Sequence, residues 1–289
     1  EVSLLNPKAL VIISKKKSGF IAGADIKEFT TLTHSLAYDL VRSGQKVLDR
    51  LERLPFPTVS AIHGFALGGG LELALACTYR VAASDIKTSL GLPEVLLGIH
   101  PGFGGTVRAV QLLGPLAAMD LILTGKTINS EKAHSIGLVD HLSTLVDLRT
   151  EAKRFALKRP PKHQPTFFSR LVNSVFFRSF VARKLIKEVA KRANAKHYPA
   201  PYAVIDLWKR YGAQGSNAYE AEAQSIAALF TTPSSQNLVR VFILQDRLKN
   251  LGTKAEHPIK HVHVVGAGVM GGDIASWCAA NGLEVSIQD

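Results

Sequence analysis

The chain has 289 residues, 46% hydrophobic and 20% charged, and its 35 basic and 23 acidic residues give a formal net charge of +12. This composition is that of a globular protein, and no apolar run approaches the ~18 residues that span a bilayer. We expect no secretory signal, because the opening EVSLLNPKALVII has no basic stretch followed by a cleavage site. The basic excess favours anionic partners, but no nucleic-acid-binding motif accompanies it, so nucleic acid is not expected.

The first half of the chain alternates short strand-like runs with longer helical patterns, which indicates an α/β fold. Apolar and β-branched runs predict strands at residues 8–14, 57–64 and 79–84. Helices are predicted over 34–54, 107–123 and 130–137. The first of these is predicted from an apolar stripe of Leu36, Leu40, Val41, Val47, Leu48 and Leu51. For the third helix we predict Ser130 as the N-cap, with Glu131 in the first turn.

After residue 150 the segments are helical, basic and punctuated by prolines. Basic residues gather at 153–163 and 183–196, where Lys184, Lys187 and Lys191 share a helical face that we expect to be solvated. One or two amphipathic helices are predicted over 218–249, with a break near residues 231–233. Residues 250–258 are predicted to be a polar linker.

The segment GGGLELA (68–74) passes from glycines directly into a helical pattern. Glycines allow unusual backbone angles, and the free N–H groups at a helix start can stabilise an oxygen that gains negative charge. Glu72 lies in the first helical turn, three residues after Gly69. Taken alone, the motif is equally well explained as a tight turn in which Glu72 complements the helix dipole.

A second carboxylate follows in GLPEVLLGIHPGFGGT (91–106), where Glu94 lies among apolar residues. An apolar neighbourhood raises the pKa of a carboxyl group, so Glu94 can hold or exchange a proton near neutral pH. Two carboxylates facing one pocket are suited to acid/base work on a bound water. His100 is a candidate third group, but we expect it to be a loop histidine.

The segment AGADIKE (22–28) adds another glycine turn. In order and spacing, AGADIKE, GGGLELA, GLPEVLLGIHPGFGGTVR and LTGKTINSEKAHSIGLVD (123–140) resemble the crotonase (enoyl-CoA hydratase/isomerase) superfamily. The resemblance implies a crotonase-like ββα spiral and an acyl-CoA thioester as substrate. It implies backbone donors from Ala24 and Gly69 that form an oxyanion hole. The implied CoA-binding residues are Ala22, Gly23, Ala24, Asp25, Ile26 and Gly68.

Hydratases of this superfamily have glutamates at the positions of Glu72 and Glu94, so the resemblance implies hydration of trans-2-enoyl-CoA to L-3-hydroxyacyl-CoA. Glu72 would activate the water and Glu94 would protonate Cα. Δ3,Δ2-enoyl-CoA isomerisation stays an alternative, because it needs only proton shuttling over the same enolate. Val107 replaces the glutamine common in the family, and we expect no loss of chemistry from it. No metal is expected.

The final segment has a strand pattern at 259–265, then GAGVMGG, a helical pattern and a strand ending at Asp289. Gly266, Gly268 and Gly271 form G-x-G-x-x-G at the strand-to-helix turn, and this context predicts the first βαβ unit of a Rossmann domain. Asp289 would bind a ribose hydroxyl, which favours NAD over NADP as cofactor.

The predicted organisation is an enoyl-CoA hydratase domain (1–192), a helical linker region (193–258) and the start of an NAD-binding domain (259–289). This arrangement resembles the multifunctional β-oxidation proteins, the α-subunits of fatty-acid oxidation complexes. The resemblance implies NAD-dependent 3-hydroxyacyl-CoA dehydrogenase activity, an oligomer or complex, and a thiolase partner. It also implies that segments are missing at both ends, so a catalytically incompetent acyl-CoA- or dinucleotide-binding fragment is a further alternative.

Cys77 and Cys278 lie far apart in apolar helical patterns, so we expect two buried reduced thiols and a reducing compartment. That compartment would be the bacterial cytoplasm, or the peroxisome or mitochondrial matrix in a eukaryote.

Overall fold

The computed structural model describes residues 5–251 and 259–289. The chain divides into two compact units, one ending at Phe242 and the other starting at Ile243. Of the predicted linker at 250–258, residues 252–258 lie outside the described part, and the predicted domain boundaries stay predictions. No described helix has both the length and the apolar composition needed to cross a bilayer.

Two small sheets form the framework of the first unit. The larger is parallel throughout, with the order β1 (Leu10–Ile13), β2 (Thr58–Ile62), β4 (Tyr79–Ala83), β7 (His141–Ser143). The smaller has the order β3 (Phe65–Leu67), β5 (Ser89–Gly91), β6 (Thr127–Asn129), with only the last pair antiparallel. Because β2 leads into β3 and β4 into β5, successive strand pairs and their helices form the expected ββα spiral.

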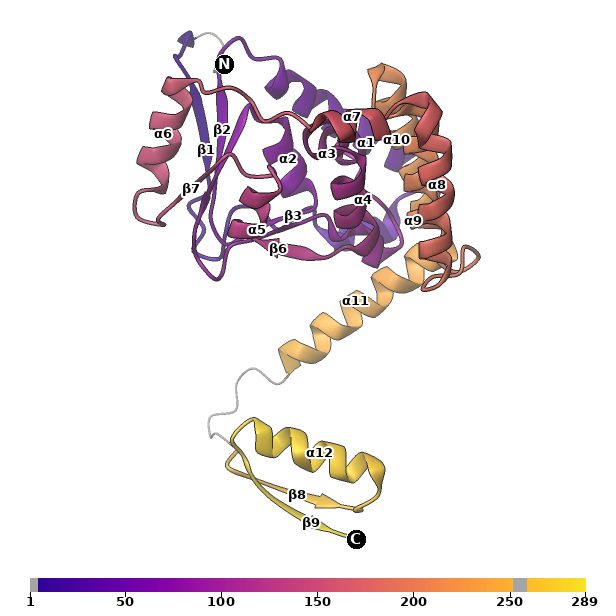
Figure 1. Cartoon of the computed structure of the whole chain (residues 1–289). Helices are drawn as coiled ribbons and strands as arrows, with labels where there is room; N and C mark the ends of the chain where they lie inside the picture. Colours follow the sequence, from indigo (N-terminus) through magenta and orange to yellow (C-terminus); the bar gives the residue numbers. More distant parts are fainter. Residues whose placement is uncertain (1–4, 252–258) are drawn as a thin grey trace. The chain divides into compact units, whose positions relative to one another are not determined.

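Strands β2 and β4 are buried on both faces, as expected for parallel strands between helical layers. Val59 and Val81 face α6 (Leu148–Lys158), whereas Ile62 and Ala82 belong to the main core with α2 (Gly69–Ala76). Figure 1 shows these two helices on opposite faces of the sheet. The helix α2 is apolar almost all round, which is typical of a helix inside a core.

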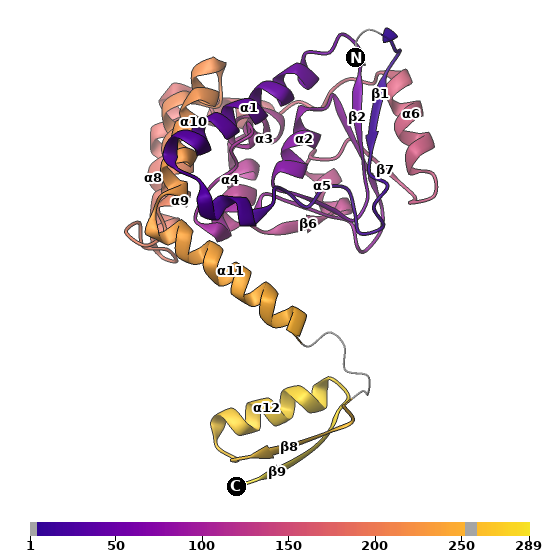
Figure 2. The ribbon, with the colours of Figure 1, turned by 180° about the vertical axis from the view of Figure 1, so that it is seen from behind.

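The remaining helices of the first unit cover the side of the spiral away from α6 (Figures 1 and 2). They comprise α1 (His34–Glu52), α3 (Gly105–Leu113), α4 (Pro115–Thr124), α5 (Ser130–Ser135), α7 (Phe167–Val172), α8 (Val175–Ala190), α9 (Pro199–Tyr211) and α10 (Gly215–Phe230), together with the 3-10 helices η2 (Ile26–Thr31) and η3 (Pro93–Leu97). The break predicted near residues 231–233 separates α10 from α11 (Pro233–Leu251).

The buried face of α1 differs from the predicted stripe. Leu36, Leu40 and Val47 are exposed, whereas the buried residues are Ala37, Val41, Gln45 and Leu48. The face turns because α10 packs on α1, where a small alanine permits close approach and Gln45 is buried through hydrogen bonds. Helix packing therefore overrides the count of large apolar residues here.

Two local predictions are wrong for identifiable reasons. The N-cap of α5 is Asn129, whose side chain accepts a hydrogen bond from the Lys132 N–H, rather than Ser130. The helix predicted over 107–123 is two helices, because Gly114 has a φ of +80° and interrupts α3 and α4. Val107 packs into the main core.

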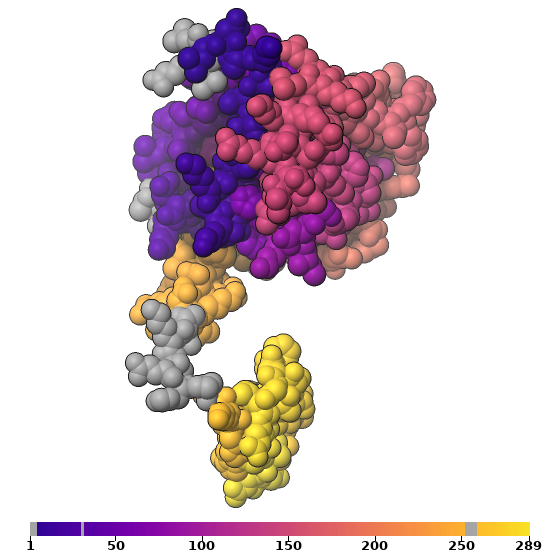
Figure 3. Space-filling model, turned by 90° about the vertical axis from the view of Figure 1, so that its left-hand side faces the viewer, coloured from indigo at the N-terminus to yellow at the C-terminus, as the bar shows by residue number. Residues whose placement is uncertain are grey.

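On the surface, the exposed Lys184, Lys187 and Lys191 form the solvated face that was predicted for α8. The start of the chain lies beside the segment around α6, as the indigo and pink surfaces of Figure 3 show. There, the Arg159 guanidinium donates to the carbonyl of Lys8 at 3.4 Å.

The second unit contains β8 (His261–Val265), α12 (Val269–Ala280) and β9 (Glu284–Gln288). The two strands are parallel, as a βαβ connection requires. No residue of α12 is buried, because two strands cover little of the helix. Cys278 is consequently only half-buried, contrary to the prediction, whereas Cys77 in the first unit is buried as expected.

Candidate active site

Two glycine turns lie side by side because residues 19–23 run along β3. The Ile21 N–H donates to the Phe65 carbonyl and the Leu67 N–H donates to the Ile21 carbonyl, both at 2.9 Å. This approach requires glycine at position 70, since a Cβ there would lie 2.3 Å from the Ile21 carbonyl oxygen. The pairing brings the turn at Gly23 next to the turn that starts α2.

Ala24 and Gly69 therefore line one cavity. Gly68, with a φ of +53°, is the N-cap of α2, so Gly69 is the first helical residue and its N–H has no partner within the helix. Among the residues that the structure describes, neither N–H donates a hydrogen bond. Both are thus available to an oxygen atom of a ligand.

The cavity has a volume of about 310 Å³ and mostly apolar walls. All the residues predicted for catalysis, oxyanion stabilisation and CoA binding in this unit line it: Ala22, Gly23, Ala24, Asp25, Ile26, Gly68, Gly69, Glu72 and Glu94. The side chain of Asp25 also caps η2 by accepting from the Lys27 N–H at 3.0 Å. The structure thus brings these residues together, while their individual roles stay predictions.

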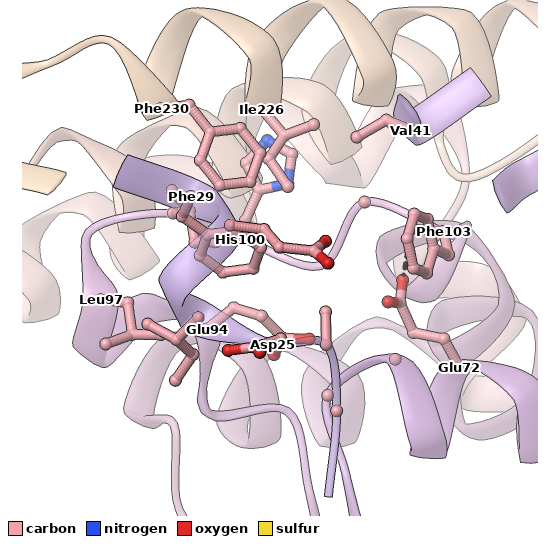
Figure 4. Close-up of a pocket in the computed structure, with 18 of the residues that line it drawn as sticks. Asp25, Phe29, Val41, Glu72, Glu94, Leu97, His100, Phe103, Ile226 and Phe230 are labelled. Atoms are coloured by element: carbon pink, nitrogen blue, oxygen red, sulfur yellow. Dashed lines mark hydrogen bonds between the residues drawn. The ribbon is translucent and has the colours of Figure 1, made fainter. Parts of the chain in front are cut away.

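The Glu72 carboxylate is buried and held on one oxygen. Its Oε1 accepts hydrogen bonds from the N–H groups of Phe103 and Gly105, at 2.7 and 2.8 Å. Figure 4 shows Glu72 below Phe103 at the cavity wall, and Oε2 makes no hydrogen bond to a described residue. One oxygen is therefore fixed by the protein while the other is available to a ligand.

Glu94 differs sharply in its hydrogen bonding. It enters the cavity from η3 (Figure 4), with Gly68 so close that a Cβ there would lie 3.2 Å from Oε1. Both of its carboxylate oxygens are buried, and neither has a hydrogen-bond partner among the described residues. Such a carboxyl group is more stable protonated than ionised.

The pKa values follow from these surroundings. Burial raises the pKa of Glu94 to about 8, and the charge of Glu222 adds to this effect. Burial also raises the pKa of Glu72 well above its usual range, as do the charges of Glu94 and Glu222, while the Gly105 and Phe103 N–H groups oppose the rise. Two N–H groups favour the ionised form of Glu72, whereas only its own backbone N–H favours that of Glu94, so the shared proton is better placed on Glu94.

His100 lies at the cavity, but both ring nitrogens are engaged by the protein. Nδ1 lies 2.7 Å from the Pro101 carbonyl oxygen, so it donates, and Nε2 then accepts from the Ser225 hydroxyl at 2.8 Å. Burial lowers the pKa of His100 to about 4. This arrangement agrees with the prediction of a structural loop histidine.

Sequence reasoning missed the contribution of α10. Ile226 and Phe230 line the cavity, and the Phe230 ring packs edge-to-face on Phe29, with centroids 4.9 Å apart. Glu222, one helical turn before Ile226, is fully buried next to the Glu72 loop. The spacing of these residues by four was visible in the sequence, but only the fold shows that this helix face meets the cavity.

In the second unit, the three glycines of the G-x-G-x-x-G motif differ in backbone angle and in the space around them. Gly266 has a φ of +103°, and a Cβ on Gly271 would lie 1.7 Å from the Gly266 carbonyl oxygen. Gly268, the N-cap of α12, has open space around it. The Asp289 carboxylate accepts a hydrogen bond from the Ala267 N–H at 3.1 Å. The turn thus needs glycine at position 266 for its positive φ and at position 271 for close packing, whereas no described residue packs against Gly268.

In the first unit, the two-sheet spiral places a pair of buried carboxylates and two unpaired backbone N–H groups around one apolar cavity, an arrangement typical of the active site of an α/β enzyme. Residues 6–200 match the family described as enoyl-CoA hydratase/isomerase. The chain belongs to this family, as the sequence resemblance predicted.

Similar solved structures include a Bacillus anthracis enoyl-CoA hydratase, with 28% identity and a TM-score of 0.50 over 85% of this chain and 80% of that one. An enoyl-CoA hydratase from Rhodobacter sphaeroides has 21% identity and a TM-score of 0.63, over 86% and 79% of the chains. Human mitochondrial Δ3-Δ2-enoyl-CoA isomerase has 20% identity and a TM-score of 0.58, over 85% and 82%. The last two likenesses concern the fold alone.

Proposed function

We propose that the cavity of the first unit hydrates trans-2-enoyl-CoA to L-3-hydroxyacyl-CoA. The observation that carries this proposal is the unequal pair of buried carboxylates at one cavity: Glu72 is held by two N–H groups, whereas the oxygens of Glu94 have no hydrogen-bond partner in another described residue. Two carboxyl groups whose environments favour different protonation states are suited to act as base and acid in one reaction.

The thioester carbonyl oxygen accepts hydrogen bonds from the N–H groups of Ala24 and Gly69. Negative charge develops on this oxygen as water attacks Cβ, and the helix dipole of α2 adds to the stabilisation. One such donor contributes about 3 kcal/mol to transition-state stabilisation. The carbonyl is thereby polarised without any charged side chain in contact with it.

Glu72 acts as the base through its free Oε2. It accepts a proton from the water whose oxygen bonds to Cβ, while the protonated Glu94 transfers its proton to Cα. The C=C π bond is lost, a C–O and a C–H bond form, and the net proton passes from Glu94 to Glu72. Return of the proton between the two carboxylates restores the resting site. Because both carboxylates act on the same side of the double bond, the addition is syn.

The test uses crotonyl-CoA, with loss of the conjugated enone absorbance as the signal, and a 3-enoyl-CoA substrate for isomerisation. We expect hydration by the unmodified chain, and losses of about 10²- to 10⁴-fold in kcat for Glu72→Gln and Glu94→Gln. Glu220→Gln, on the outer side of α10, serves as the control and keeps its rate. Isomerisation without hydration, or unchanged rates in both variants, would overturn the proposal.

We further propose that the second unit binds NAD at the start of α12. The open space at Gly268 suits a pyrophosphate approaching the helix N-terminus, the tight contact at Gly271 brings helix and strand together, and Asp289 suits a ribose hydroxyl. Bound NAD would supply hydride acceptance. The hydration product, a 3-hydroxyacyl thioester, belongs to the class of substrates that NAD-dependent dehydrogenases oxidise. This proposal therefore includes a multifunctional protein that carries both activities and has a thiolase partner.

Amide chemical-shift titration of the chain with NAD and NADP tests this binding directly. We expect saturable shifts with NAD at residues 266–272 and weaker binding of NADP, because Asp289 repels a 2′-phosphate. Gly268→Ala should weaken NAD binding by roughly tenfold or more, whereas Gly272→Ala, which also has open space around it, is the matched control. Absence of saturable shifts would refute the proposal.

A further inference from the structure

The turn that holds Glu72 is shared with a second buried carboxylate. Four consecutive N–H groups, of residues 103–106, alternate between the two partners. Those of Phe103 and Gly105 donate to Glu72, whereas those of Gly104 and Thr106 donate to Glu222 at 2.6 and 3.0 Å. Gly104 adopts φ +95° at the start of α3, a conformation that lets successive N–H groups converge on anions.

Glu222 is fully buried and has further donors. The Thr106 hydroxyl donates to its Oε2, and the Gln45 Nε2 donates to its Oε1 at 3.0 Å. Gln45 is itself fixed, since its Oε1 accepts from the Arg42 guanidinium at 2.6 Å and its Nε2 also contacts the Gly102 carbonyl at 3.0 Å. A buried carboxylate with this many donors is an organised element of the site rather than a chance inclusion.

The helix that carries Glu222 also forms the cavity wall. Glu222, Ile226 and Phe230 follow one another at intervals of four residues and so lie on one face of α10. This helix lies beyond residues 6–200, where the chain matches its family. A segment predicted to belong to the linker region therefore contributes both an apolar wall and a charged group.

We infer that Glu222 is a positioning residue of the active site: it fixes the 103–106 turn, whose Phe103 and Gly105 N–H groups in turn hold Glu72 with its second oxygen free. The inference rests on the proposed hydratase function. Without Glu222, Gly104 and Thr106 lose their acceptor, the turn relaxes, and Glu72 loses its fixed orientation toward the water. A misplacement of about 1 Å can cost ~10²-fold in rate.

Several charged groups surround Glu222, and these are the groups that loss of its negative charge would affect. From α2 comes Glu72, from η3 Glu94, and from α3 Arg108, whose guanidinium lies over the Tyr219 ring. The charge of Glu222 raises the pKa of both Glu72 and Glu94.

From α1, the neighbouring charges are those of Arg42, Asp49 and Glu52, the last two paired with Arg108. His100 reaches α10 through Ser225, but burial lowers its pKa to about 4, so it is neutral near pH 7. The carboxylates are therefore the groups that respond when Glu222 is neutralised.

The decisive variant is Glu222→Gln, which keeps the shape but loses the charge and one acceptor. We expect kcat for crotonyl-CoA to fall roughly 10- to 100-fold with KM little changed, because the thioester contacts are untouched. The fall of activity at alkaline pH should also move to lower pH, since Glu94 loses a neighbouring charge. A purely structural defect would lower the rate without moving this limb.

Thr106→Val, which removes only the hydroxyl donor, is the second variant and should give a smaller loss of kcat. Glu188→Gln is the control: Glu188 is exposed on α8, pairs with Lys191 and should keep wild-type kinetics. A folded Glu222→Gln protein with unchanged kcat, or with only KM raised, would overturn the inference.

The amide shifts of Phe103 and Gly105 in the ligand-free protein provide a readout that is independent of turnover. We expect both to move in Glu222→Gln and neither to move in Glu188→Gln. If the wild type fails to hydrate crotonyl-CoA, the proposed function fails while these shifts still decide the role of Glu222. Unchanged shifts would refute the positioning role even in an active enzyme.

Discussion

The unpartnered carboxyl group of Glu94 makes the stability of the first unit depend on pH. Its pKa of about 8 in the folded protein exceeds the ordinary 4.5, so the folded chain retains a proton that the unfolded chain releases. The free energy of unfolding therefore falls as pH rises between these values. From pH 5.5 to pH 8.5 the contribution of this single group is about 3 kcal/mol. Glu94→Gln removes the ionisation and should flatten the curve by about this amount.

Urea unfolding at the two pH values, followed by tryptophan fluorescence, measures the effect. Trp208 is 2% exposed in the first unit and Trp277 is 73% exposed in the second, so a Trp277→Phe background makes Trp208 the only reporter. Glu188→Gln is the control: Lys191 lowers the pKa of this exposed group, which stays ionised over the whole range. An equal pH dependence of the free energy of unfolding in the wild type and in Glu94→Gln would refute the raised pKa of Glu94.

Four further substitutions probe the cavity and the turn beside it. Gly69→Pro removes the oxyanion-binding N–H at a helix position where proline is favoured, so kcat should fall about 10²- to 10³-fold. Gly69→Ala, whose Cβ meets only the Phe103 ring at 3.5 Å, should retain activity in the same assay. Gly70→Ala places a Cβ 2.3 Å from the Ile21 carbonyl oxygen and should lower the free energy of unfolding in urea by about 2 kcal/mol or more. Phe230→Ala opens the apolar wall, so the ratio of kcat/KM for decenoyl-CoA over crotonyl-CoA should rise by roughly tenfold.

The first unit could be predicted well wherever a short motif determines its own geometry. The glycine turns, the helix that carries Glu72 and the apolar setting of Glu94 all follow from local residue order, and the structure shows each of them. The family resemblance over the same motifs is likewise confirmed by the match over residues 6–200.

Features that depend on tertiary packing were not predictable in this way. Glu222 lies 118 residues from Gly104 in sequence, and nothing local indicates that they bond. On α1 the predicted Val41 and Leu48 are buried, but the buried face also includes Ala37 and Gln45, because α10 packs there, while Leu36, Leu40 and Val47 stay exposed. Cys278 sits in an apolar pattern, but two strands alone do not bury the helix that carries it.

The central claim is that Glu72 and Glu94 add water across a conjugated thioester from one side. Hydration of crotonyl-CoA in D₂O, with the product examined by NMR, tests it most directly. We expect L-3-hydroxybutyryl-CoA with one deuterium at C2, on the same side as the new hydroxyl, and loss of this product in Glu94→Gln. An anti product, or unchanged formation of the syn product in Glu94→Gln, would contradict it.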